Sequence, residues 1–410
     1  MKIAAAEALA QLAREDVPDE VARVYGQGRL QYGPEYLIPT PFDPRLIATV
    51  SSAVAQAAMD SGVAAKPIAD MEAYRHQLTA RLNPMSAIGQ TIAAAAKSKP
   101  KRIVFAEGEE PQVIRAAAEF MRNGYGEAVL IGYEDRVKAQ IAELGVTDCD
   151  GLEIHNARVS DRTGAYLDFL YDRLQRRGML KRDCQRLVNQ DRNVFGACMV
   201  ETGDADGMVT GLTRSYGVCL DDVLKVIDPR PGHRLFACAI VKAQGRTVFI
   251  SDVAVHELPT PDQLADIASQ TAAFAKRLGF VPRVAFLSFS NFGNPARAKA
   301  ERIRDAVAAL DDQRPDFEYD GEMAVDTALD FELMRNAYPF TRLTGPANVL
   351  IMPALHSANI TYKLVREIGG GVLGPILVGL EKPVQILPMG AAASDIVAAA
   401  TQTAYQAAES

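Results

Sequence analysis

Short apolar runs alternate with longer amphipathic stretches through most of the chain. The runs Ile103–Ala106 and Ala128–Gly132 have the character of buried strands, and a helix is predicted between them at Val113–Asn123. Strand, helix and strand at this spacing form a βαβ unit, which implies a parallel sheet with helices on its faces. The pattern therefore predicts an α/β fold for this part of the chain.

The same alternation continues to the C-terminus. Helices are predicted at Ala165–Arg177 and Arg182–Glu201, and a short strand that begins at Asp206 runs into a turn of glycines and hydroxyls. A second βα series follows, with strands predicted at Arg246–Asp252, Arg283–Leu287 and Asn348–Met352 and helices at Asp262–Leu278, Pro295–Leu310 and Asn359–Glu367. Two α/β layers are expected.

The N-terminal stretch has a different pattern. Helices are predicted at Met1–Leu12, briefly after Asp16, and at Arg45–Met59, and the proline-rich piece Leu37–Pro44 forbids a helix before the last of them. The Arg45–Met59 helix is rich in Ala and Val on all sides and needs a partner to cover it. This stretch is either a packed N-terminal appendage or the tail of a larger domain.

Composition narrows the function classes. The 410 residues suggest two or three domains, and 48% hydrophobic residues are enough to bury them. A formal charge of -7 argues against nucleic acid or an anionic membrane as the main partner, because those partners demand clustered Lys and Arg. No run approaches the roughly 20 apolar residues of a membrane span. We expect a cytoplasmic protein.

Cysteines and histidines do not point to a metal or a hydrolase. The five cysteines (Cys149, Cys184, Cys198, Cys219 and Cys238) contain no C-x-x-C pair and are expected to be reduced core residues. His233, His256 and His356 lack ligand spacing and are expected to be structural, and no G-x-S-x-G motif occurs. Catalysis by a bound metal is therefore not predicted.

Four segments after strands have the composition of ligand-binding turns, because ligands bind beyond the carboxyl ends of strands in open α/β sheets. The first combines glycines, hydroxyls and an arginine that suit a phosphate or a carboxylate, and the second places small polar residues before Pro295. The third offers an apolar wall and an amide, and the fourth runs from Leu387 into the C-terminal helix. The alternative for each is a structural turn, a helix cap or core. The candidate residues are Thr210, Gly211, Thr213, Arg214, Ser215 and Tyr216; Ser288, Ser290, Asn291, Phe292 and Gly293; Asn359, Lys363, Gly374, Pro375, Ile376 and Leu377; and Pro388, Met389, Gly390 and Asp395.

Two segments of the N-terminal stretch are similar in sequence to a known family. The segment from Tyr32 to Leu46 (YGPEYLIPTPFDPRL) and the segment from Ala53 to Ala64 resemble the end of the catalytic region of large bacterial NADP-dependent malic enzymes. The resemblance implies that residues 1–65 are the tail of the catalytic, NAD(P)-binding domain and residues 66–82 a linker helix. It also implies a C-terminal fragment whose NADP and divalent metal sites lie in a missing catalytic region of the same parent chain.

Residues 83–410 resemble the phosphotransacetylase family, which moves acetyl between coenzyme A and phosphate. The motifs include Ala205–Gly211, Asp320–Ala328 and Gly390–Ile396. The resemblance implies a phosphotransacetylase-like (isocitrate/isopropylmalate dehydrogenase-like) α/β fold with parallel-type sheets flanked by helices. Subdomain 1 would comprise about 83–231 and 379–410, and subdomain 2 about 232–378, with a coenzyme cleft between them. It also implies self-association through phosphotransacetylase-type dimers. The Ala-rich helix Ile396–Ala408 is among the apolar surfaces that need a partner to bury them.

Active members of that family use positively charged groups that this chain replaces. Their Ser-Arg pair falls on Pro388 and Met389, while the family's Asp is retained as Asp395. The family's other two arginines fall on Asp221 and Leu174. Arg173 and Arg176 lie beside Leu174, and Arg214 remains a candidate to rescue an anion site.

The resemblance leaves three hypotheses. The first is a region without catalytic residues that binds acetyl-CoA or a related acyl-CoA and transmits its presence to a malic enzyme catalytic domain in the same chain. The second is an active phosphate acetyltransferase, and the third is a domain that only drives assembly.

Overall fold

A computed structural model describes residues 1–15, 17, 32–34, 36–41, 43–82, 86–146, 151–243, 245–369 and 371–409. By internal contacts the chain divides into two compact units, residues 1–90 with 392–394, and residues 91–391 with 395–410. The predicted boundaries after residues 65 and 82 stay predictions. In the part of the chain described, no helix is both long and apolar enough to cross a bilayer.

The first unit is helical over its described residues. It contains α1 (Lys2–Arg14), α3 (Arg45–Asp60) and α4 (Met71–Leu82), with α1 packed on α3 and α3 on α4. The Asp43 carboxylate fixes the start of α3 because it accepts hydrogen bonds from the Arg45 backbone N–H (3.0 Å) and from Arg45 Nη2 (2.7 Å). The short helix predicted after Asp16 lies outside the described residues.

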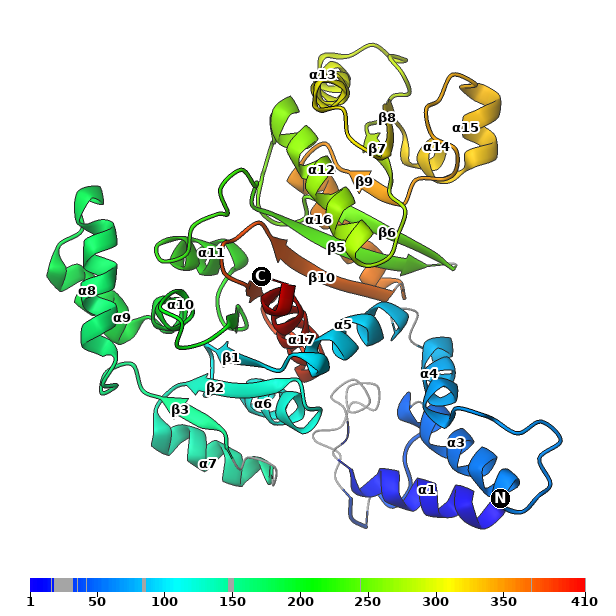
Figure 1. Ribbon diagram of the computed structural model, residues 1–410, viewed down its shortest axis with the longest axis vertical. Helices are drawn as coiled ribbons and strands as arrows, with labels where there is room; N and C mark the ends of the chain where they lie inside the picture. Colours follow the sequence, from blue (N-terminus) through cyan, green and yellow to red (C-terminus); the bar gives the residue numbers. More distant parts are fainter. Residues whose placement is uncertain are drawn as a thin grey trace. The chain divides into compact units, whose positions relative to one another are not determined.

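The second unit begins with a five-stranded sheet in the order β11-β4-β1-β2-β3 (Figure 1). Every neighbouring pair in it is parallel, as the βαβ pattern predicts. The strands are β1 (Lys101–Phe105), β2 (Gly126–Ile131), β3 (Glu153–His155), β4 (Gly207–Thr210) and β11 (Val384–Ile386). The helices of this part are α5 (Ser86–Ser98), which begins in the first unit, α6 (Pro111–Arg122), α7 (Glu134–Leu144), α8 (Thr163–Leu174), the 3₁₀ turn η1 (Gln175–Arg177), α9 (Lys181–Gln190), α10 (Arg192–Glu201), α11 (Tyr216–Leu224) and α17 (Ala393–Glu409).

Side-chain alternation along β4 shows which helices cover which face. A Cβ on Gly196 of α10 would meet Met208, whereas a Cβ on Gly207 would meet Thr403 of α17. Since successive strand residues point to opposite faces, α10 and α17 cover opposite faces of this sheet. The C-terminal helix, which the sequence indicated to need cover, is covered within its own chain, because α17 is buried at most positions from Ile396 to Tyr405. Self-association stays a prediction.

One predicted helix, Arg182–Glu201, is two. Asp191 interrupts it, and its carboxylate accepts hydrogen bonds from the backbone N–H groups of Asn193 (2.9 Å) and Val194 (3.2 Å). An aspartate in this role is an N-cap, so α10 starts anew at Arg192. The amphipathic pattern of the sequence continues across Asp191, so it did not indicate that one helix ends and another begins there.

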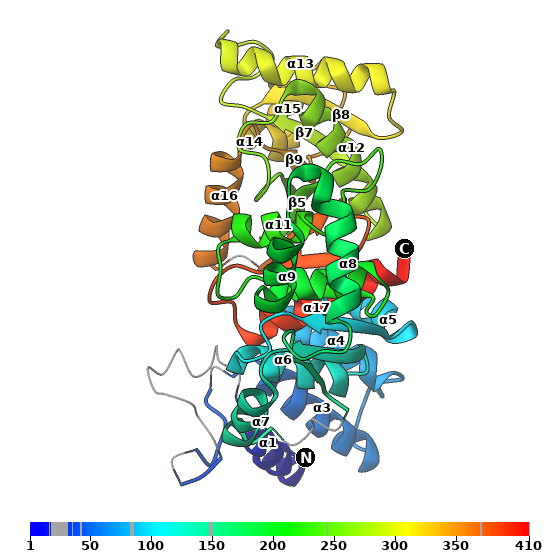
Figure 2. The same cartoon turned by 90° about the vertical axis from the view of Figure 1, so that its left-hand side faces the viewer.

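The second sheet has six strands in the order β10-β5-β6-β9-β7-β8. Figure 2 shows α12 and α16 on opposite sides of it. The strands are β5 (Phe236–Ala243), β6 (Arg246–Ser251), β7 (Arg283–Leu287), β8 (Glu318–Met323), β9 (Val349–Ile351) and β10 (Gly371–Val378), and the helices are α12 (Pro261–Arg277), α13 (Ala298–Gln313), α14 (Val325–Leu329), α15 (Phe331–Ala337) and α16 (Leu355–Glu367).

The part of this sheet from β6 to β8 is parallel, as expected, and β5 makes the sheet mixed. Strand β5 runs antiparallel to both β6 and β10. The physical reason is the connection from Ala243 to Arg246, which is far too short for the crossover that a parallel pair needs. The helix predicted at Pro295 also starts later, at Ala298.

Two segments carry the chain between the sheets, residues 228–235 outward and residues 378–383 on the return. They bond to each other, because the Arg230 N–H donates to the Gly379 carbonyl (2.8 Å) and the Glu381 N–H to the Asp228 carbonyl (3.0 Å). Gly379 has φ 102°, and a Cβ there would lie 2.3 Å from the Arg234 carbonyl oxygen. Only glycine fits this close approach of the two crossing segments.

Candidate functional site

The first predicted turn lies where expected, directly after β4. Gly211 has φ 120°, and a Cβ there would lie 2.3 Å from the Leu387 carbonyl oxygen. The Leu387 N–H donates to the Thr210 carbonyl (2.7 Å), and the Gly390 N–H donates to that of Leu212 (3.3 Å). The first and fourth predicted segments therefore meet at the carboxyl ends of β4 and β11.

A carboxylate of the protein itself occupies the anion-binding groups of this turn. Glu107, which follows β1 and is 2% exposed, accepts hydrogen bonds from the backbone N–H groups of Gly211 (3.1 Å), Leu212 (2.7 Å) and Thr213 (2.9 Å) and from the Thr213 hydroxyl (2.7 Å). The donors that suit a phosphate or a carboxylate are thus occupied by a carboxylate of the protein itself, and binding of an external anion stays a prediction. Glu107 lies beside the turn because it follows β1, the parallel neighbour of β4, and no spacing in the sequence indicated this.

Arg214 is not available as the rescuing positive charge that the sequence suggested. Its Nη1 forms ion pairs with Asp191 (2.6 Å) and Asp222 (3.0 Å), and Asp222 also pairs with Lys225 (2.6 Å). The Arg214 side chain is 31% exposed and the Asp222 side chain 8%. Two carboxylates already neutralise this guanidinium, so it cannot add net positive charge to a ligand site.

The second predicted turn also contains an internal carboxylate. Glu322, which is fully buried, accepts hydrogen bonds at Oε1 from the Ser290 hydroxyl (2.8 Å), the Gly293 N–H (2.9 Å) and Arg304 Nη1 (3.2 Å). Asn291 is engaged as well, since its Oδ1 accepts from the Ala324 N–H (2.8 Å). Phe292 packs against the rings of Tyr338 and Phe340. Ser288, at the end of β7, donates its backbone N–H to the Met323 carbonyl (2.9 Å).

The third predicted segment divides between two elements. Asn359 lies in α16 and donates its Nδ2 to the Val253 carbonyl (3.2 Å), while Lys363 is exposed on the same helix. Gly374, Pro375, Ile376 and Leu377 do not form a turn after a strand, because they belong to the edge strand β10. The apolar alternation of this strand was too short to identify it in the sequence.

Asp395, the retained acidic residue, is held across the two sheets. Its carboxylate pairs with Arg366 of α16 at 2.9 Å, and both side chains are about one third exposed, at 34% and 37%. This pair connects the helix after β9 to the helix after β11. Arg366 was not among the predicted site residues, because no motif surrounds it.

The fourth segment presents apolar groups where the family resemblance expects a serine and an arginine. Met389 is 65% exposed, Pro388 is half-buried, and Gly390 has φ 73°. Leu174 is 4% exposed within the apolar core, so its position cannot present a charge, and Asp221 is exposed. Beside them, Arg173 pairs with Asp228 at 2.6 Å.

Two further residues at the first predicted turn carry hydroxyl groups. Ser215 is the exposed residue before α11, and the Tyr216 hydroxyl that follows is buried without a hydrogen-bond partner among the described residues. Burial raises the pKa of Tyr216 well above its ordinary value. The first and fourth predicted segments and α16 converge here.

The Ser288–Gly293 turn lies apart from this place. It follows β7, and β5, β6 and β9 separate β7 from β10, so that these two strands are about 19 Å apart.

The described thiols are buried, and burial keeps them protonated near neutral pH. The four cysteines that the structure describes are buried and free, as the sequence predicts, and Cys149 lies outside the described residues. Burial raises the pKa of Cys219 to about 11 and those of Cys198 and Cys238 to about 12. His256 is structural, since its Nε2 contacts the Leu235 carbonyl at 2.9 Å.

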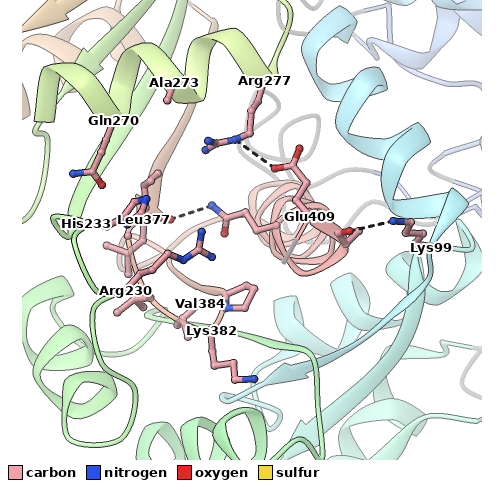
Figure 3. Close-up of a pocket in the computed structure, with 16 residues that line it drawn as sticks. Lys99, Arg230, His233, Gln270, Ala273, Arg277, Leu377, Lys382, Val384 and Glu409 are labelled. Carbon is pink, nitrogen blue, oxygen red and sulfur yellow. Dashed lines mark hydrogen bonds and ion pairs between the residues drawn. The ribbon is translucent and has the colours of Figure 1, made fainter. Parts of the chain in front are cut away.

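A pocket of about 630 Å³ lies at the other end of β11, between the two crossing segments, α12 and the end of α17 (Figure 3). We call it the crossing pocket. It is lined by Lys99, Arg230, His233, Gln270, Ala273, Arg277, Leu377, Val378, Gly379, Leu380, Lys382, Pro383, Val384, Gln406, Ala408 and Glu409. It shares only Leu377 with the predicted residues, and nothing in the sequence patterns singled it out.

Comparisons with known proteins agree with this fold. Residues 87–404 match the family described as phosphate acetyl/butaryl transferase. The chain is 34% identical to a phosphate acetyltransferase of Clostridium acetobutylicum over 78% of this chain and 98% of that protein. A phosphotransacetylase crystal structure from Streptococcus pyogenes superposes with a TM-score of 0.73 at 31% identity, covering 79% of this chain and 99% of that one.

A longer protein is also similar over the whole chain. An NADP-dependent malic enzyme of Rhizobium meliloti is 56% identical over 99% of this chain, but the chain spans only 54% of that protein's length. The predicted phosphotransacetylase-like fold is thus confirmed, and so is the resemblance to malic enzymes. The chain belongs to the phosphate acetyl/butaryl transferase family.

Proposed function

We propose that this chain is the C-terminal, acetyl-CoA-sensing region of an NADP-dependent malic enzyme and that it does not itself transfer acetyl groups. The observation that carries the proposal is the neutralisation of two arginines of the front cleft, by which we mean the Thr210–Tyr216 turn, the Leu387–Gly390 loop and the adjoining part of α16. Transfer from acetyl phosphate needs cations that hold the phosphate dianion and balance charge in the transition state. In this cleft Arg214 faces Asp191 and Asp222, and Arg366 faces Asp395.

The chemistry of the thioester fits the remaining groups. Binding a coenzyme A thioester requires apolar and hydrogen-bonding contacts but no nucleophile, and the exposed Met389 offers an apolar surface. The buried Tyr216 hydroxyl lacks a partner and would gain one from an acceptor such as a thioester carbonyl. Acetyl-CoA or a related acyl-CoA is therefore the proposed effector.

The proposal assigns oxidation and decarboxylation of malate to the rest of the longer protein. Among the described residues there is no group of three His, Cys, Asp or Glu placed to hold a metal ion, so these side chains do not fit the divalent metal of that reaction. The proposed NADP site likewise belongs to the remainder of the protein. For a signal to pass, acetyl-CoA must bind two conformations of the whole enzyme unequally.

The test is a thermal shift of the 410-residue chain with acetyl-CoA. A ligand at 100 times its dissociation constant is expected to add about 2.7 kcal/mol to the free energy of unfolding. Met389→Glu places an anion on the cleft surface and should remove this shift, whereas Val159→Glu, at a side chain that is 78% exposed, should keep it. An unchanged melting temperature with excess acetyl-CoA would leave only the assembly role.

A second candidate function is an active phosphate acetyltransferase. The retained Asp395 and the 34% identity to a phosphate acetyltransferase favour it. A coupled assay with acetyl phosphate and coenzyme A separates the two, because the first proposal expects no turnover above background. Sustained turnover that scales with protein concentration would replace the first proposal by the second.

A further inference from the structure

The crossing pocket is built from both sheets of the second unit. Arg230 and His233 come from the outgoing crossing segment, Lys382 from the returning one, and Arg277 from α12 of the six-stranded sheet. Its volume of about 630 Å³ lies within the range of about 300–1,000 Å³ that is typical of small-molecule sites. A ligand here would touch both crossing segments at once.

Positive charge is concentrated in this pocket, although the chain as a whole is acidic. Four side chains of Lys or Arg line it (Lys99, Arg230, Arg277 and Lys382), and Glu409 is the one carboxylate among its described lining residues. Four positive charges against one negative charge leave a formal charge of +3. Figure 3 shows the Arg230 and Arg277 side chains extending toward the same space from opposite sides, with Lys99 and Lys382 at the margins.

Two of the four cations have no ion pair among the described residues, and the other two contact the end of α17. Arg277 Nε pairs with Glu409 at 3.4 Å, and Lys99 Nζ donates to the Ala408 carbonyl at 3.4 Å. Arg230 and Lys382 form no ion pair with any residue that the structure describes. Two guanidinium groups directed at one space repel each other unless an anion lies between them, and guanidinium binds phosphate oxygens in bidentate fashion.

The polar residues of the wall supply groups for a larger ligand. Gln270 Oε1 has no hydrogen-bond partner among the described residues, although its Nε2 donates to the Asp266 carbonyl (3.4 Å). His233 is exposed at the pocket and contacts the Pro231 carbonyl through Nδ1 (3.1 Å). A phosphate group alone would leave much of the volume and these groups unused.

We propose that the crossing pocket binds a small molecule that carries a diphosphate group and an attached organic portion, such as a nucleoside diphosphate. The diphosphate lies between Arg230 and Arg277, where a charge of about -3 matches the formal charge of the pocket, and the organic portion contacts Gln270 and His233. The site is separate from the front cleft and does not depend on the function proposed for it.

The test is isothermal titration of the 410-residue chain with inorganic pyrophosphate and, separately, with ADP. Both are expected to bind at one site per chain, ADP at least as tightly as pyrophosphate, and both more weakly at high salt. Arg230→Gln should weaken both by about tenfold or more, because it removes a charge-assisted bidentate contact. The Arg230 side chain has no described ion pair, so this variant is expected to fold.

Controls separate the site from general anion attraction. The double variant Arg186→Gln and Lys299→Gln removes two exposed cations elsewhere and should bind both probes as the wild type does. Met389→Glu should also leave pyrophosphate binding unchanged, which distinguishes this site from the front cleft. No binding of either probe, exclusion of ADP, or equal weakening by Arg230→Gln and the control double variant would overturn the proposal.

Discussion

The turn after β4 and the crossing pocket lie at opposite ends of β11, and they treat anions in opposite ways. The turn has the composition of a phosphate site, with Gly211, Thr213 and Arg214, yet Glu107 fills its donors and two aspartates neutralise its arginine. The pocket has no glycine and hydroxyl motif, and its Arg230 has no ion pair among the described residues. Arg214 of the turn is therefore neutralised by the protein itself, whereas Arg230 of the pocket is not neutralised by any residue that the structure describes.

This difference shows that the composition of a loop predicts its chemistry but not its occupant. Buried backbone donors must find partners, and a nearby carboxylate satisfies them as well as a phosphate does. Glu322 does the same for the Ser288–Gly293 turn in the other sheet. An anion site open to ligand is identified by cations that lack an internal partner, which only the folded structure reveals.

The largest expected effect comes from opening the turn. Glu107→Ala leaves three backbone N–H groups and one hydroxyl without their acceptor, and each unsatisfied buried donor costs about 1–3 kcal/mol. We expect the free energy of unfolding to fall by about 3–5 kcal/mol, measured by urea denaturation. Formate, which can occupy the vacated donors, should restore part of this loss in the variant and none in the wild type.

The matched control for Glu107 is Glu127, whose side chain is 71% exposed and which pairs with Arg102 at 3.3 Å. Glu127→Ala should change stability by less than about 1 kcal/mol, because exposed ion pairs contribute little. If Glu107→Ala and Glu127→Ala cost the same, or if formate stabilises the wild type equally, the internal carboxylate is not what fills the turn.

A smaller effect is expected from giving the crossing pocket its own counter-ion. Gln270→Glu is nearly isosteric and places a carboxylate at the wall that Arg230 and Arg277 share. We expect stability to rise by about 0.5–1 kcal/mol, since the added carboxylate lies near the two guanidinium groups, and pyrophosphate binding to be lost. Urea denaturation and isothermal titration measure the two results.

Gln11→Glu on the exposed face of α1 makes the same chemical change away from the pocket and should leave stability within about 0.5 kcal/mol. If Gln270→Glu binds pyrophosphate as tightly as the wild type does, the cations of the crossing pocket are not where the anion binds.

Local pattern predicted the elements of the second unit well where the chain repeats strand and helix. The strands at Ile103, Ala128 and Arg283 and the helices near Val113 and Asp262 are present, because buried parallel strands carry continuous apolar runs. Strands β5 and β10 were missed, and with them the mixed character of the second sheet. Asp191 shows the limit for helices: an aspartate within a long helical pattern is a cap only when its carboxylate accepts from the backbone N–H groups of the residues that follow it.

The site was predictable in part for a similar reason. The meeting of the Thr210 turn with the Leu387 loop follows from two parallel strands that end at one sheet edge. The partners that decide its chemistry, Glu107, Asp222 and Arg366, come from other elements, and no spacing in the sequence connects them. The crossing pocket is assembled from five separate stretches, so local motifs could not indicate it.

The smallest expected effect tests whether the front cleft depends on the ion pair between Arg366 and Asp395. Arg366→Gln removes the partner of Asp395, but both side chains are about one third exposed, so solvent screens the pair and we expect a loss of about 0.5 kcal/mol in the free energy of unfolding. In 1 M salt the variant and the wild type should converge, because screening removes the Coulomb attraction. Lys138→Gln breaks the exposed pair with Glu134 and should be indistinguishable from the wild type at any salt concentration. A loss several times larger than expected, unaffected by salt, would mean that the Arg366 side chain stabilises the front cleft by packing rather than by charge. The α16 side of the cleft would then be stabilised differently from the Thr210–Tyr216 turn, where a carboxylate fills the hydrogen-bond donors.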